Sequence, residues 1–140
     1  MKELGERWFD TVRGGDVDAI AAMLTDDVDF YTPAGSVRGP QEAAALLHGF
    51  AVAMPDAGFN IRQWIEEGNS AAAEGSYTGT HTGPLAGPMG EVPATGRSVD
   101  VPFTTVFEVR DGKISAHRAY WDNATFMMQL GLMPPPGGGA

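Results

Sequence analysis

The chain has 140 residues, 43% of them hydrophobic, which suits one globular domain with a core of its own. Its formal net charge is −9, and its nine Lys and Arg residues form no basic cluster of the kind that binds nucleic acids or anionic membranes. The absence of cysteine excludes disulfides, thiol nucleophiles and cysteine-ligated metals. We therefore expect a small hydrophobic or aromatic ligand.

The N-terminal residues lack the uninterrupted apolar stretch of a signal peptide. No run of about 18 apolar residues is present that would span a membrane. From these two absences we expect a cytoplasmic protein without a membrane partner, and from the negative net charge we expect no nucleic-acid partner.

The first half of the chain predicts three helices, at residues 4–12, 17–24 and 40–53, because apolar residues recur there every three or four positions. Asp16 has the position and the side chain of an N-cap for the second helix. A short strand hairpin, at residues 28–38, is expected between the second and third helices.

In the second half the apolar period changes to two, which predicts long strands at residues 59–66, 71–81, 98–109 and 113–122. Residues 82–96 are so rich in Gly and Pro that we expect no regular structure, only a loop that shapes an opening. A short helix at 124–130 follows the last strand. We expect a single domain over residues 1–132 and a flexible Pro/Gly tail at 133–140.

The turn at Asp111 and Gly112 predicts the register of the last two strands, with residue 101 opposite 122 and residue 105 opposite 118. Side chains alternate along a strand, so one face of the last strand carries Ile114 and Ala116, which we expect in the core. The same face then carries three polar or amphipathic residues: Arg118, Tyr120 and Asp122. This register predicts a carboxylate in apolar surroundings, beside Val101 and Phe103.

Five short motifs stand in a fixed order along the chain: Gly79–Gly83, Pro93–Arg97, Asp111–Ile114, Tyr120–Asp122 and Gln129–Leu132. Together they resemble the SnoaL-like polyketide cyclases of the NTF2-like superfamily, over nearly the whole chain from Trp8 to Leu132. The order of elements by itself predicts an α+β domain. The resemblance implies an NTF2-like cone or half-barrel, in which a curved antiparallel sheet wraps around the N-terminal helices.

The resemblance also implies a cofactor-free enzyme that closes a ring by intramolecular aldol condensation on a polyketide-like or polycyclic carbonyl compound. Asp122 would then be its catalytic general acid and base, because an apolar site raises a carboxyl pKa towards neutrality. The alternative for Asp122 is an ordinary helix N-cap. The alternatives for the protein are a non-catalytic small-molecule-binding module, or a hydrolase, hydratase or isomerase; Thr32 occupies the position of the general base of ketosteroid isomerases.

Seven residues are candidates for substrate binding: Arg118, Tyr120, His81, Phe103, Thr105, Trp8 and Gln63. His81 ends a strand beside the Gly/Pro loop, where a residue at the mouth of a pocket would lie; a solvated turn histidine is the alternative. His117 falls on the face opposite Asp122, where we expect packing. No metal site is expected, since the three histidines lie in separate elements.

An apolar outer strand face would favour a homodimer. We expect that face to carry Val106, Ala119 and Trp121.

Overall fold

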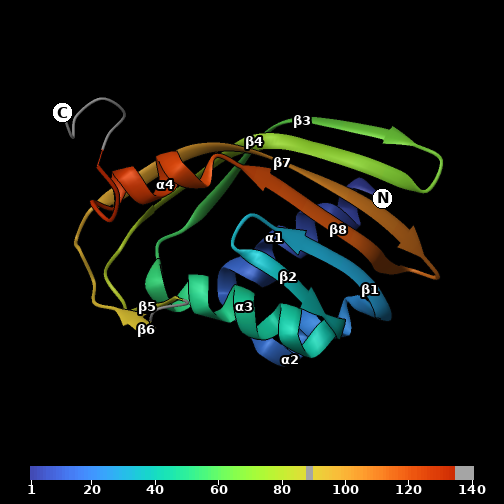
Figure 1. Ribbon diagram of the computed structural model, residues 1–140. Helices are drawn as coiled ribbons and strands as arrows, with labels where there is room; N and C mark the ends of the chain where they lie inside the picture. The colour runs from blue at the N-terminus through green and yellow to red at the C-terminus, as the bar shows by residue number, and fades with distance from the viewer. Residues whose placement is uncertain (88–89, 135–140) are drawn as a thin grey trace.

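The structure is a computed structural model that describes residues 1–87 and 90–134 (Figure 1). Its first half contains α1 (Lys2–Gly14), α2 (Val17–Ala22), β1 (Leu24–Thr32), β2 (Gly35–Arg38) and α3 (Gly39–Ala53). Its second half contains β3 (Gly58–Glu67), β4 (Ser70–Thr80), β5 (Leu85–Gly87), β6 (Gly90–Val92), β7 (Ser98–Arg110), β8 (Lys113–Trp121) and α4 (Asn123–Gln129). The predicted order of helices and long strands is confirmed.

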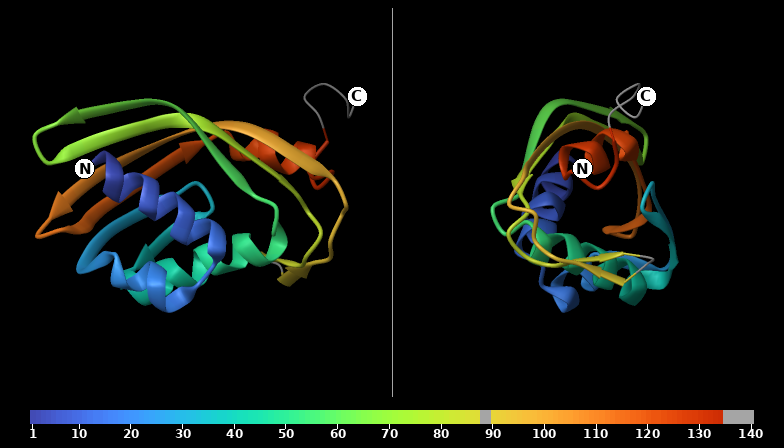
Figure 2. Two further views of the ribbon diagram at one scale, coloured as in Figure 1. Left: turned by 180° about the vertical axis from the view of Figure 1, so that it is seen from behind. Right: turned by 60° about the vertical axis from the view of Figure 1, so that its left-hand side comes forward.

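Six strands form one sheet in the order β2-β1-β8-β7-β4-β3. β1 runs parallel to β8, and the other neighbours are antiparallel. The long strands curve over α1 and α3, and α4 lies at one end of the molecule (Figures 1 and 2). The predicted α+β class and the half-barrel around the N-terminal helices are therefore confirmed.

Local sequence accounts for the helices. α1 buries Gly5, Trp8, Phe9 and Val12 along one stripe, which packs into the main core. It ends at Gly15, whose positive φ of 73° is a conformation that glycine adopts without strain. The carboxylate of Asp16 accepts a hydrogen bond from the Ala19 N–H at 3.2 Å, which confirms the predicted N-cap of α2. None of the helices in the described ranges is long and apolar enough to cross a membrane.

The Gly/Pro-rich segment differs from expectation, because β5 and β6 pair there as a small antiparallel hairpin. Pro88 and Met89, between these strands, lie outside the described residues, as do residues 135–140 of the expected tail. The prediction of a loop without regular structure is therefore wrong for residues 85–87 and 90–92. Breaker-rich composition did not prevent three-residue strands from pairing.

The register of the large sheet shifts at three places, and the two in β3 and β8 are single-residue β-bulges that change the faces of these strands. In β3, Ile61 pairs with Gly75 but Gln63 pairs with Glu74, so Arg62 is an extra residue. In β8, Ile114 pairs with Val109 but Ala116 pairs with Glu108.

Ser115 is the extra residue of the second bulge, and its hydroxyl donates to the Glu108 carbonyl at 3.1 Å. Because side chains alternate with a period of two, each extra residue moves every later side chain of its strand to the opposite face.

Candidate functional site

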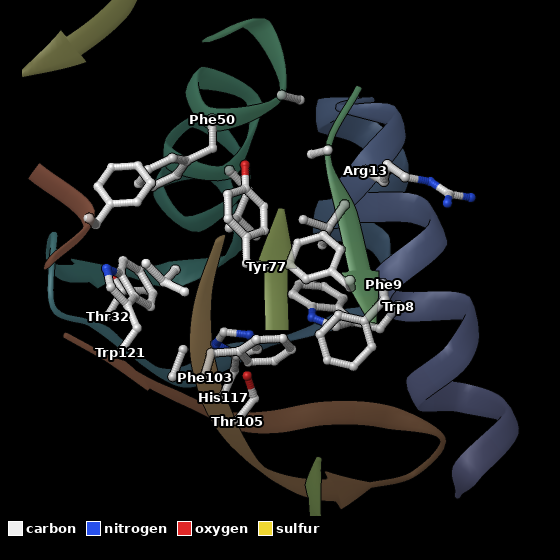
Figure 3. A pocket seen from close by; sticks show the side chains of 18 residues that line it. Trp8, Phe9, Arg13, Thr32, Phe50, Tyr77, Phe103, Thr105, His117 and Trp121 are labelled. Carbon is white, nitrogen blue, oxygen red and sulfur yellow. The ribbon is translucent and has the colours of Figure 1, made fainter. Parts of the chain in front are cut away.

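A cavity of about 80 Å³ lies between the helices and the concave face of the sheet. Its wall is mostly aromatic and aliphatic (Figure 3). It is lined by Trp8, Phe9, Val12, Arg13, Thr32, Leu47, Phe50, Ala51, Ala57, Phe59, Tyr77, Val101, Phe103, Thr105, His117, Ala119, Trp121 and Phe126. None of these lining residues, all within the described part of the chain, is an aspartate or a glutamate. An apolar wall with a few polar groups is typical of small-molecule sites.

His117 is the one imidazole in this wall. Its ring stacks on Phe30 with centroids 4.4 Å apart and an interplanar angle of 6°, and it also contacts Trp8 and Phe107. Burial lowers the pKa of His117 from 6.5 to about 3, so the ring is neutral at physiological pH. Its Nδ1 atom is buried and has no hydrogen-bond partner among the described residues. The Thr25 hydroxyl and His81 Nε2 are also buried without a partner among the described residues, so it is the place of His117 in the cavity wall that makes it a candidate.

Tyr77 provides a second polar group. Its hydroxyl lies 3.5 Å from the Sδ atom of Met54, and a thioether is a weak acceptor. Burial, and then the Asp56 carboxylate, raise the pKa of Tyr77 well above its usual value, so the hydroxyl keeps its proton. Tyr77 is therefore a hydrogen-bond donor with only a weak protein partner.

Two other polar groups in the wall, the Thr32 hydroxyl and the Trp121 indole N–H, are engaged within the protein. The Thr32 hydroxyl donates to the Gly35 carbonyl and accepts from the Ala34 N–H, both at 3.2 Å. The Trp121 indole N–H donates to Asn123 Oδ1 at 3.2 Å. These bonds stabilise the β1–β2 turn and the start of α4, so Thr32 and Trp121 are less available to a ligand than His117 and Tyr77.

Three of the seven predicted binding residues, Trp8, Phe103 and Thr105, line the cavity. Trp8 projects from α1, and the other two project from the inner face of β7. All three are buried. Their placement follows from the helical stripe of α1 and from the uninterrupted alternation of β7.

The expected position of Asp122 in an apolar interior is wrong. The bulge at Ser115 shifts the register, so that Trp121 rather than Asp122 faces the inner side opposite Phe103, and the Asp122 carboxylate is exposed. It accepts hydrogen bonds from the Thr125 hydroxyl at 2.7 Å and from the Thr125 N–H at 3.1 Å, which lower its pKa. The structure thus gives Asp122 the geometry of the alternative interpretation, the N-cap of α4.

Arg118 and Tyr120 face outward for the same reason, so the structure contradicts their expected place in the pocket. Arg118 forms ion pairs with Glu108 at 3.0 Å and Asp29 at 3.3 Å across the outer face of the sheet. Tyr120 is 47% exposed and packs beside Tyr31. Both residues lie outside the cavity lining.

Gln63 and His81 also lie outside the cavity. The bulge at Arg62 puts Gln63 on the exposed side of β3 and turns Trp64 inward. His81 is fully buried instead of lying at a mouth, because residues 93–97 fold over it. Its Nδ1 accepts the Thr95 N–H at 3.2 Å, and its backbone N–H and C=O bond to Arg97 and Gly96. His81 therefore holds the end of β4 to the following loop.

The sequence interpretation missed His117, Ala119 and Trp121 as cavity residues. It placed Ala119 and Trp121 on an apolar outer face that would favour a dimer, and the structure places both in the cavity wall. A signal was present in β8, because its apolar residues change from even positions, Ile114 and Ala116, to odd positions, Ala119 and Trp121. Such a change of parity indicates an extra residue in a strand.

No group of three His, Cys, Asp or Glu residues in the described ranges is arranged to hold a metal ion. Among the described lining residues only Arg13 is charged, and its guanidinium pairs with the exposed Asp10 carboxylate at 3.0 Å. The other polar atoms of the site belong to neutral side chains. An arrangement of this kind can orient an uncharged molecule and donate hydrogen bonds to its oxygen atoms.

Comparisons with known proteins agree with this geometry. The family model described as "SnoaL-like domain" matches residues 5–117, whereas a search of curated proteins gave no match. The structure of TsrD from Streptomyces laurentii superposes with a TM-score of 0.78 at 25% identity, over 94% of this chain and 95% of that one.

A candidate SnoaL-like polyketide cyclase from Jannaschia sp. CCS1 has a TM-score of 0.79 at 26% identity, over 95% of this chain and 92% of that one. IdmH, a candidate polyketide cyclase from Streptomyces antibioticus, has a TM-score of 0.75 at 23% identity, over 93% of this chain and 97% of that one. At that identity the likeness to IdmH shows the fold alone.

Proposed function

Because the chain belongs to the SnoaL-like domain family and has the NTF2-like fold of SnoaL-like structures, we propose that it is an enzyme acting on a small carbonyl compound bound in the internal cavity. Family membership confirms the resemblance read from the sequence motifs. The observation that carries the proposal is His117, a neutral imidazole in a wall that is otherwise almost wholly apolar.

The size and lining of the cavity indicate what binds there. Aromatic rings surround the space on several sides, which favours a flat or cyclic apolar body (Figure 3). A dry apolar cavity of about 150 Å³ holds one benzene molecule. The present cavity of about 80 Å³ is about half that size, so even a single ring needs side chains of the wall to move apart, and a polycyclic substrate would need a larger movement.

The sequence predicted that Asp122 contacts the substrate as general acid and base. We assign that contact to His117 instead, as a hydrogen-bond donor. Its Nδ1 atom has almost no accessible surface, so we assign the ligand contact to Nε2. A ring with a pKa near 3 is a poor base at neutral pH but a good hydrogen-bond donor to a carbonyl oxygen. In an aldol ring closure a base takes a proton from the α-carbon, the new C–C bond forms, and the attacked carbonyl oxygen gains a proton. The described residues of the cavity wall include no carboxylate, so solvent water takes the first proton and returns one to the oxygen. A donor at that oxygen stabilises the charge that develops there.

The test uses heptane-2,6-dione, whose intramolecular aldol addition gives 3-hydroxy-3-methylcyclohexanone, with NMR to follow both compounds. His117→Phe preserves a flat ring beside Phe30, and we expect it to lower kcat/KM about a hundredfold or more. The matched variant Asp122→Asn keeps a good N-cap, and we expect it to stay within about threefold of the parent. The reverse pattern would restore Asp122 as the catalytic group and reject His117.

A second candidate function is binding without turnover. Two observations favour it. No carboxylate is among the described residues that line the cavity, and His117 has too low a pKa to act as a base near neutral pH. A dione that shifts the amide resonances of Ala119 and Phe103 without forming product would support this second candidate. A homodimer and a cytoplasmic location stay predictions.

A further inference from the structure

We propose that Tyr77 binds a second oxygen of the ligand, so that the preferred substrates are neutral compounds with two carbonyl oxygens at opposite ends of a small apolar ring or chain. This inference rests on the proposed function, because it assumes that a ligand enters the cavity and contacts His117. It adds to the proposed function how many oxygen atoms the ligand carries, where they lie on the ligand, and that the ligand is uncharged.

The first support is the weak hydrogen bond of the Tyr77 hydroxyl. Buried tyrosine hydroxyls ordinarily have a good partner, but this one has a thioether sulfur at 3.5 Å. The phenolic hydrogen has two preferred orientations in the plane of the ring, so an oxygen atom placed in the cavity within reach of the hydroxyl can replace the sulfur as acceptor. The exchange leaves the tyrosine ring where it is.

The second support is the fixed position of the ring. Tyr77 projects from β4, where it is paired with Val101 of β7, and its ring packs beside Phe59 with centroids 5.2 Å apart. Figure 3 shows the hydroxyl directed towards α3 and away from His117, which lies at the other side of the cavity. A ligand that contacts both groups therefore extends across the cavity, with one oxygen at each end.

The third support is the charge of the two groups. Tyr77 keeps its proton because its pKa is raised, and His117 is neutral because its pKa is lowered. Arg13, the cation among the described lining residues, already pairs with Asp10 at 3.0 Å, so a carboxylate beside Tyr77 and His117 would be a buried charge without a free counter-charge, which is strongly unfavourable. The acceptors that fit this site are therefore uncharged carbonyl oxygens.

The test compares two ketones of nearly equal size, cyclohexanone and cyclohexane-1,4-dione, by NMR titration of the labelled protein. The quantity of interest is the affinity ratio of dione to monoketone. Tyr77→Phe removes only the hydroxyl, and we expect it to lower this ratio about fivefold, the effect of one hydrogen bond. Met54→Leu removes the competing sulfur at nearly constant volume, and we expect it to leave the ratio unchanged or raise it.

The outcomes separate this inference from the proposed function. If both ketones bind and Tyr77→Phe leaves the ratio unchanged, the inference is wrong and the proposed function stands. An equal decrease of the ratio in Tyr77→Phe and Met54→Leu would show a packing effect, and that result also rejects the inference. If neither ketone binds to the parent protein, the proposed function and the inference both fail.

Discussion

The buried neutral state of His117 predicts how the stability of the protein depends on pH. The pKa of His117 is about 3 in the folded protein, against an ordinary value of 6.5 for the unfolded chain. Below pH 6.5 the unfolded chain binds a proton that the folded protein does not, so acid favours unfolding. The stabilisation is therefore fully present above pH 6.5 and is lost progressively as the pH falls from 6.5 towards 3.

The magnitude follows from the same two values. Each pH unit between them changes the free energy of unfolding by about 1.4 kcal/mol. Between pH 7.5 and pH 5, the loss attributable to His117 is about 2 kcal/mol. The rings around the imidazole, Trp8, Phe30 and Phe107, carry no charge that would offset it.

The assay is urea unfolding of the parent and of His117→Phe at pH 7.5, 6.5, 5.5 and 5.0. Carboxylates titrate alike in both proteins, so the difference between their unfolding free energies isolates the histidine. We expect that difference to change by about 2 kcal/mol over the range, with the parent losing more stability in acid. A difference that does not change with pH would refute the buried, neutral state of His117.

Two further predictions concern backbone contacts. Gly75→Ala would place a Cβ 2.1 Å from the Asn60 carbonyl oxygen beside the β3 bulge, and we expect it to lower the free energy of unfolding by about 2 kcal/mol or more, measured by urea denaturation. Gly49→Ala is the control, because a Cβ there meets nothing within 4 Å and no positive φ is involved. Gln129 bonds to both the N–H and the C=O of Asp100, at 2.7 and 3.0 Å, so Gln129→Leu should speed hydrogen exchange at the Asp100 amide about fivefold; unchanged exchange there would contradict the contact.

Most of the elements were predictable from the sequence, because their signals are local. The apolar stripe of α1, the N-cap at Asp16 and the turn at Asp111 each depend on a few neighbouring residues. The uninterrupted alternation of β7 also placed Phe103 and Thr105 correctly in the wall of the cavity. These inferences needed no knowledge of what packs against the segment.

The site was less predictable, because its faces depend on two single-residue insertions. Up to the second bulge the predicted register holds, with Arg110 opposite Lys113 and Val109 opposite Ile114. Beyond Ser115 the register is displaced by one residue, which exchanges Asp122 for Trp121 and Arg118 for His117 on the inner face. The bulge at Arg62 had the same effect on Gln63 and Trp64.

The sequence by itself therefore determined the order of helices and strands, the α+β class and the family, since periodicity, capping and motif spacing are properties of the chain. Only the tertiary structure decided which side chains meet inside. A bulge forms where neighbouring strands and the packed core accept an extra residue, and that choice depends on contacts between segments far apart in the sequence. The bulge at Ser115 places His117 in the cavity wall and leaves Asp122 as the N-cap of α4.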